Sequence, residues 1–308
     1  MTSASADSEQ FDHNLCTRPH YFLFIILGVF TSISLCGLVG NVVVVWLLGF
    51  RMKQNPFTVY VLNLAIADLC LLLILLAGFI ILMTSGQYCN LSDGLFLTIG
   101  FMALLFLFCY LAGMYLLTAM SVERCLAVWF PVWYRCHRPK HLSGALCGVL
   151  WALAALFLLL LFLTCAFTES CLEIFSVLNI VNFALFSFIP LLSNLALFIK
   201  LRCGSQRRHP GKLYVALLLS VIFLVIFGLP FTVSNFLPAF DAGFFSISCL
   251  LISLNSSINP VLYFLVGNCR QRRFQCSVKA AFQRLFEEEA TSEERSQVPG
   301  DAVMETSV

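Results

Sequence analysis

The chain has 308 residues, of which 60% are hydrophobic and only 11% are charged, and its formal net charge is +2. Soluble domains are nearer about 45–50% apolar and about 25% charged, so burial in one soluble core cannot account for this composition. Lipid can, because it covers apolar side chains on the outside of a fold. The composition therefore excludes an ordinary soluble domain, and no nucleic-acid partner is expected.

The N-terminal segment, residues 1–20, is polar and acidic and is expected to lie outside the cell. A cleavable signal peptide needs a basic segment followed by an apolar run, and the sequence has neither before Tyr21. We therefore expect the first membrane span to act as an uncleaved signal.

Seven apolar stretches are long enough to cross a membrane, which takes about 20 residues in a helix. Each must be helical, because backbone groups cannot remain unpaired in lipid. The sequence therefore predicts an all-α membrane protein, a seven-transmembrane helix bundle that occupies 21–266. The expected spans are 21–50, 57–83, 95–125, 142–167, 174–201, 213–239 and 244–266.

Basic residues indicate the orientation, because loops rich in Lys and Arg stay on the cytoplasmic side. Of the 18 Lys and Arg residues, only Arg18 falls on the side of the N-terminus. The prediction is a multi-pass protein of the plasma membrane, with its N-terminus extracellular and its C-terminus cytoplasmic. An odd number of spans agrees with ends on opposite sides.

The predicted outer loops are short and acidic. The first contains the sequon Asn90-Leu91-Ser92, which either carries a glycan or goes unused because it lies too near the membrane. The second, 168–173, is too short to cover the mouth of the bundle. The acids are either ordinary solubility charge or the rim of an open site that attracts cations. The expected contacts of such a site are Glu169, Glu173 and Asp241.

Asp68 is an ionisable residue inside the second span, where such residues are costly and usually functional. Its expected hydrogen-bond partners are Asn41 on the first span, and Asn255 and Asn259 on the seventh. The network is either purely structural or rearranges between two packings of the helices. Pro260 removes a backbone hydrogen bond from the seventh helix, which suits two packings but also occurs in transporters and channels.

Glu123 and Arg124 are adjacent charges at the inner end of the third span. They either extend to the membrane interface, as long charged side chains do, or take part in function.

The segment 267–286 is expected to form a cytoplasmic amphipathic helix along the membrane. Its apolar residues recur at spacings of three and four, and its basic residues would face lipid headgroups. Cys269 and Cys276 are candidates for S-palmitoylation, and the alternative is free thiols packed on the bilayer.

The last segment, 287–308, is acidic and poor in apolar residues, so we expect a disordered cytoplasmic tail. PDZ domains bind a terminal apolar residue with a hydroxyl two places earlier. Val308 and Thr306 satisfy this pattern, which also arises by chance in tails.

Ordered motifs on six of the seven spans resemble those of the rhodopsin-like G-protein-coupled receptors. They are GN with Asn41, LxxAxAD with Asp68, Glu123-Arg124-Cys125 in place of the usual Asp-Arg-Tyr, Trp151, Pro230, and NPVLY from Asn259 to Tyr263.

The finer resemblance is to the Mas-related G-protein-coupled receptors. In the segment FGLP, Gly228 stands where most rhodopsin-like receptors have a tryptophan, as it does in this family. The segments that carry the resemblance are 46–69, 116–143, 203–215, 227–230 and 259–274.

The resemblance implies a receptor that is not an enzyme, needs no cofactor or metal, and couples an extracellular ligand to a heterotrimeric G protein. The implied ligand is a cationic peptide or an amphiphilic amine, sensed in sensory neurons or mast cells. The alternatives are an orphan receptor with constitutive signalling or a non-peptide ligand, and a polytopic transporter. A transporter would need several midplane charges or an internal repeat, and the sequence has one midplane acid and no repeat.

The resemblance also implies roles for single residues. Glu123 would hold Arg124 in the inactive receptor and release it on activation. The rest of the expected coupling machinery is Asn259, Pro260 and Tyr263.

Two further features are implied by the resemblance. A disulfide between Cys165 and Cys171 would replace the usual bridge from the third span, whose cysteine is missing here. A sodium ion beside Asp68 is less certain, because Gly113 stands where a serine often helps to bind it.

Overall fold

The protein is a bundle of long helices, seen here in a computed structural model that describes residues 21–52, 55–88, 93–139, 141–167, 171–203, 212–236 and 242–268. Within these ranges the structure has helices and no strands. The helices are α2 (Tyr21–Trp46), the π-helical turn η1 (Leu47–Arg51), α3 (Pro56–Tyr88), α4 (Asp93–Trp129), α5 (Pro131–Cys136), α6 (Leu142–Phe167), α7 (Cys171–Cys203), α8 (Lys212–Phe236) and α9 (Ala242–Asn268).

Seven of these helices are long and apolar enough to cross a membrane, which confirms the predicted seven-span, all-α fold. Several extend beyond the predicted apolar stretch, as α4 does with its 37 residues. At 1.5 Å per residue, α4 is roughly 55 Å long, whereas the hydrocarbon layer is about 30 Å thick. Apolar content marks the part of a helix in lipid, and the helix itself continues on both sides.

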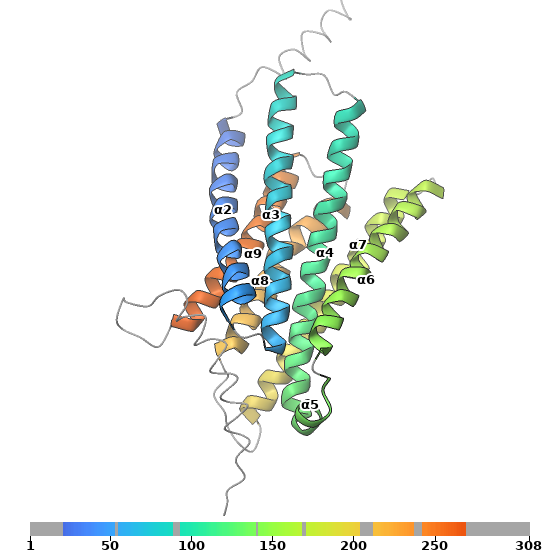
Figure 1. Ribbon diagram of the computed structural model, residues 1–308. Helices are drawn as coiled ribbons and strands as arrows, with labels where there is room; N and C mark the ends of the chain where they lie inside the picture. Colours follow the sequence, from blue (N-terminus) through green and yellow to red (C-terminus); the bar gives the residue numbers. More distant parts are fainter. Residues whose placement is uncertain are drawn as a thin grey trace, which may run out of the picture.

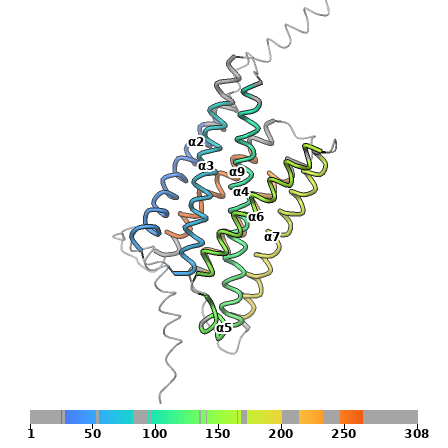
Figure 2. The backbone as a smooth tube through the Cα atoms, turned by 45° about the vertical axis from the view of Figure 1, so that its right-hand side comes forward, coloured from blue at the N-terminus to red at the C-terminus, as the bar shows by residue number. Residues whose placement is uncertain are grey.

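The helix α4 lies at the centre of the bundle, where it contacts α3, α5, α6, α7 and α8. On one side α2 and α3 stand beside it, and α6 and α7 lie on the other (Figure 1). The tube in Figure 2 shows α6 and α7 running next to each other along this second side. The helices α8 and α9 pack extensively against each other, and α9 also packs against α2.

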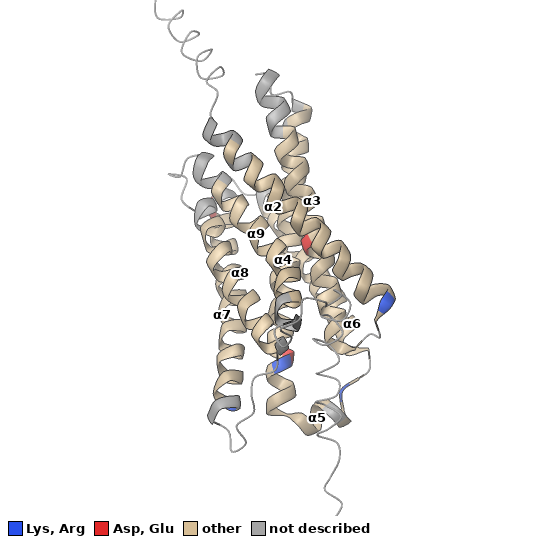
Figure 3. Cartoon of the chain, turned by 90° about the vertical axis from the view of Figure 1, so that its left-hand side faces the viewer, with Lys and Arg blue, Asp and Glu red and all other residues tan. Residues whose placement is uncertain are grey.

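Large apolar side chains cover both the inside and the outside of the bundle. Tyr60, Leu64 and Tyr115 are fully buried between helices, whereas Val39 and Phe162 are 66% and 61% exposed. So many large apolar side chains on the outside fit a surface that faces lipid. Few charges occur along the described spans, and the basic ones lie toward the end of the bundle that carries α5 (Figure 3).

Gly37 allows α2 and α9 to approach closely. A Cβ atom at this position would lie 2.1 Å from Ser257 Oγ and 2.8 Å from Leu72 Cδ1, so no larger residue fits without movement of a neighbouring helix. Small residues commonly mediate such contacts in membranes, where helices associate by close packing. The contact holds α2 beside the part of α9 that contains Pro260.

Candidate functional site

A buried hydrogen bond joins α3 to α9 in the middle of the bundle. Asn259 Nδ2 donates to Asp68 Oδ2 over 2.8 Å, and the Ser256 side chain also faces this carboxyl. Asn41 on α2 donates its Nδ2 to the carbonyls of Ser256, at 3.1 Å, and Gly37, at 3.0 Å. The structure therefore brings Asp68, Asn41 and Asn259 together, with Asn41 reaching α9 through its backbone.

The remaining predicted members of this region are buried nearby. Asn255 is 7% exposed, and its Oδ1 has no hydrogen-bond partner among the described residues. Tyr263 is buried on α9 and faces Ser220 on α8. Pro260 lies beside Gly40 of α2, where an added Cβ would be 3.0 Å from its ring. These side chains and the Asp68–Asn259 bond connect α2, α3, α8 and α9.

Near the C-terminal end of α4, an ion pair joins Glu123 to Arg138. Tyr134 donates its hydroxyl proton to the same carboxylate oxygen, Glu123 Oε1, over 2.8 Å. The short helix α5 carries Tyr134, and Arg138 follows it. Arg138 also donates to Ser143 at the start of α6. The chain between α4 and α6 therefore folds back onto Glu123.

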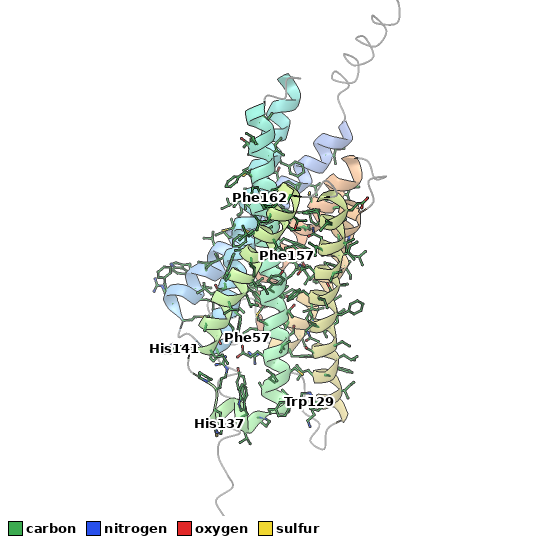
Figure 4. The ribbon with its side chains drawn as sticks, turned by 90° about the vertical axis from the view of Figure 1, so that its right-hand side faces the viewer. Phe57, Trp129, His137, His141, Phe157 and Phe162 are labelled. Carbon is green, nitrogen blue, oxygen red and sulfur yellow. The ribbon has the colours of Figure 1, made fainter. Side chains whose placement is uncertain are left out.

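The ion pair with Arg138 adds to what the sequence predicted for Glu123, whose expected partner was Arg124. Arg124 places its guanidinium carbon 4.2 Å from the centre of the Phe57 ring on α3. Figure 4 shows Phe57 toward the end of the bundle that also carries His137 and His141. The pair of Glu123 and Arg138 could not be predicted from the sequence. The two residues are 15 positions apart, and their contact depends on how the loop between α4 and α6 folds.

The surroundings of Glu123 are nearly dry. The Arg138 and Glu123 side chains are 6% and 13% exposed, so screening by water and salt is weak there. Burial and the neighbouring Glu123 carboxylate raise the pKa of Tyr134 above its usual range. Tyr134 therefore keeps its proton and remains a hydrogen-bond donor to Glu123.

At the opposite end of the bundle, the link between α6 and α7 is shorter than predicted. Only 168–170 separate these helices, and Glu173 lies in the first turn of α7, where it is exposed. An acidic residue is favourable there, because a helix N-terminus carries a partial positive charge. This accounts for the extension of the helix over residues that the sequence assigned to a loop.

Several predicted residues lie outside the described part of the structure. The side chains of Cys165 and Cys171 belong to this group, so their pairing stays a prediction. The others are Asn90, Glu169, Asp241, Cys269, Cys276, the segment 269–286 and the tail 287–308. Within the described residues, no group of three or more His, Cys, Asp or Glu could hold a metal ion.

A cavity of about 290 Å³ opens in the half of the bundle away from α5. Its walls are the facing surfaces of α3 and α4, and α7, α8 and α9 contribute one residue each, namely Phe175, Phe231 and Cys249. None of the described side chains that line it is charged. Sequence reasoning missed this cavity, because the spans are apolar on every face and their pattern does not show which face points inward.

The cavity, the buried polar contacts and the charge cluster around Glu123 all belong to the same helix bundle. Comparison with known proteins identifies the family that has this bundle. The pattern of the family "7 transmembrane receptor (rhodopsin family)" matches residues 40–263. The chain is 38% identical to the proto-oncogene Mas of Rattus norvegicus, over 86% of this chain and 84% of Mas. It is 40% identical to the human Mas-related G-protein coupled receptor member D, over 87% of this chain and 86% of that receptor. The protein therefore belongs to the rhodopsin-like receptors, within the group of Mas and Mas-related G-protein-coupled receptors, and it is a receptor and not an enzyme.

Proposed function

We propose that the protein is activated by an extracellular amphiphilic cation whose apolar part enters the 290 Å³ cavity. The observation that carries this proposal is the cavity itself, which is lined by apolar side chains from five helices of the bundle. Ligand sites are usually concave and mostly apolar, with few polar groups. The cationic group would stay near the acids of the rim, Glu173 and the predicted Glu169 and Asp241.

The proposed mechanism is a shift between two packings of the same helices. A ligand shifts such an equilibrium only by its difference in affinity for the two states. A ligand between α3, α4 and α8 contacts surfaces whose spacing changes if α8 moves. The Asp68–Asn259 bond lies below the cavity in the same bundle and ties α3 to α9, so a change of packing alters it. A difference of about 1–3 kcal/mol gives a 5–150-fold effect.

The proposed output is nucleotide exchange on a heterotrimeric G protein at the inner end. Arg124 would contact the G protein there, after α8 moves outward. The proposed orientation has the N-terminus outside the cell and the C-terminus in the cytoplasm, and the distribution of Lys and Arg supports it. Membrane lipid would contact the exposed apolar faces of the helices and the predicted segment 267–286.

The experiment uses the full chain in nanodiscs with a panel of purified heterotrimeric G proteins. Cationic peptides and alkylamines are added, and nucleotide exchange is measured. We expect an alkylamine to raise exchange, with lower potency on the Glu173→Gln variant, because the attraction at the rim is reduced. Neutral alkanes of the same length serve as controls. Exchange that no cationic amphiphile raises in any G protein would contradict the proposed ligand class.

We also propose a PDZ protein as a cytoplasmic partner, on the strength of the terminal Thr306 and Val308. Addition of one alanine after Val308 removes the terminal carboxylate from its position and should abolish capture of PDZ domains. The measurement is a pull-down on a PDZ-domain array, with Ser307→Ala as the control that keeps both recognition positions. Equal capture with and without the added alanine would show that the tail is not recognised in this way.

A further inference from the structure

Two buried polar groups close to the apolar cavity lack hydrogen-bond partners among the described residues. They are the Tyr110 hydroxyl on α4 and Asn182 Nδ2 on α7, and the two residues are only 6% and 7% exposed. Thr232 lies beside Tyr110, and its own hydroxyl proton goes to the Gly228 carbonyl over 3.1 Å, so it can offer the Tyr110 hydroxyl an acceptor but no donor. A buried polar group without a partner costs free energy, so such groups indicate a site that something polar completes.

Both groups line a small separate cavity of about 10 Å³, together with Asn179 and Thr232. A space of this size holds about one water-sized group. The position of Asn182 is fixed from its other side, because Tyr115 donates to Asn182 Oδ1 over 2.8 Å. The amide nitrogen is therefore held in place as a donor, next to a hydroxyl that both donates and accepts.

Gly228 creates the room for this arrangement. A Cβ atom there would lie 2.6 Å from the Tyr110 hydroxyl oxygen and 3.0 Å from Phe183 Cε2. Any larger side chain at this point of α8 would push the tyrosine away. The residue that distinguishes the FGLP segment thus opens the small cavity instead of filling it.

The small cavity lies next to the large one, and Phe231 lines both. Phe231 forms an aromatic cluster with Phe106 and Tyr110, with ring centres 5.3 Å and 5.7 Å from its own. No described charged residue lines either cavity. An ionised group would lose its water there without a counter-charge, which is strongly unfavourable, whereas a neutral hydroxyl or carbonyl would gain hydrogen bonds.

We infer that Tyr110 and Asn182 form a subsite for a neutral hydroxyl or carbonyl at the inner end of the ligand. This inference rests on the proposed amphiphilic ligand and specifies its other end. The ligand has a cation at the rim, an apolar body in the large cavity, and a neutral acceptor in the small one. Glu173 and Asn182 are nine positions apart on α7, which is roughly 13–14 Å along the helix.

The test compares decylamine with its ω-hydroxy analogue, which differs only in the terminal hydroxyl. Binding to the full chain in nanodiscs is measured from the shift in thermal unfolding with amine concentration. We expect the hydroxylated amine to bind about tenfold more tightly, since it gains hydrogen bonds in a dry site. Tyr110→Phe and Gly228→Ala should each remove most of this preference.

Two variants separate the inference from the proposed function. Tyr214→Phe removes a hydroxyl from α8 far from both cavities, where it donates to the Asn194 carbonyl, and it should keep the tenfold preference. Glu173→Gln should weaken both amines equally. Equal affinity of the two amines for the unmodified chain would overturn the subsite and leave the cationic ligand intact. Absence of binding by both amines would overturn the proposed ligand class and the subsite with it.

Discussion

One largely buried carboxylate, that of Glu123, lies near the C-terminal end of α4. Glu123 precedes Arg124 in the sequence, and the structure pairs Glu123 with Arg138. A carboxylate that is 13% exposed cannot be left without a partner at low cost, because uncompensated buried charge is strongly destabilising. We therefore propose that Arg138 holds Glu123 when Arg124 turns toward a G protein, and that this pair stabilises the state in which Arg124 is released.

This arrangement predicts opposite effects for Arg138→Gln and Glu123→Gln. Without Arg138, Glu123 is left to hold Arg124, and ligand-driven nucleotide exchange should fall roughly fivefold or more. Without the Glu123 charge, Arg124 is held less, and basal exchange should rise. The double variant should behave like Glu123→Gln, because Arg138 then has no carboxylate to occupy.

The control for this double-mutant cycle is Arg51→Gln, which removes an arginine from the inner end of the first span. Arg51 lies over Trp46, 5.0 Å from the ring centre, and takes no part in the Glu123 cluster. If the Arg138 and Glu123 changes had additive effects on exchange, Arg138 would not act through the Glu123 carboxylate, and the proposed role of the pair would be excluded.

Arg124→Ala should abolish nucleotide exchange while the receptor still reaches the cell surface. The change removes the group assigned to the G protein, and it also removes a contact with the Phe57 ring that is worth about 0.5–1 kcal/mol. Phe57→Leu removes the aromatic ring under Arg124 but keeps an apolar side chain in the core, and it should keep most of the exchange. Surface labelling and exchange are measured on the same cells, and normal exchange in Arg124→Ala would show that Arg124 is not the coupling residue.

At the scale of helices, the contact between α2 and α9 depends on a residue without a side chain. Gly37→Leu should reduce stability by about 1–3 kcal/mol, as overpacking does, because the new Cβ atom would lie 2.1 Å from Ser257 Oγ. The measurement is thermal unfolding in nanodiscs. Gly28→Leu is the matched control on α2, since nothing lies within 4 Å of a Cβ at that position. Equal unfolding temperatures of the two variants would mean that the helices do not meet at Gly37.

The helices themselves were largely predictable from the sequence, whereas the contacts between them were not. A run of about 20 apolar residues must be helical in lipid, and every predicted span was confirmed within several residues. The rotation of each helix about its axis could not be predicted in this way, because lipid accepts apolar side chains on all faces of a helix. Nothing in the sequence pattern brings Tyr110 and Asn182 together, and the fold places both on one cavity.

Some contacts between polar residues inside the spans could be predicted from the sequence. Asp68 and Asn259 could be paired from the sequence, since a buried carboxyl in lipid needs a donor and few donors are present. The two residues are 191 positions apart, and they form a hydrogen bond of 2.8 Å. Asn255 was assigned to the same network on equal grounds, and its Oδ1 has no partner among the described residues.

At the scale of the whole molecule, the orientation in the membrane can be tested at Asn90, which lies between α3 and α4. If the N-terminus is outside the cell, this sequon faces the glycosylation machinery and can carry a glycan. We expect glycosidase treatment to increase gel mobility, and Asn90→Gln and Ser92→Ala to have the same effect. Leu91→Ala keeps the sequon and serves as the control. Unchanged mobility of the untreated and treated chain would show that Asn90 is not used.

The three-residue connection between α6 and α7 has a consequence for how the chain is made. Two apolar helices joined so closely leave the ribosome almost together, and the entropy cost of closing a short loop is small. We expect the pair to enter the bilayer as one hairpin during synthesis, before α8 and α9 exist to pack against them. A nascent chain truncated after Cys203 should therefore already resist extraction of α6 and α7 by alkaline carbonate.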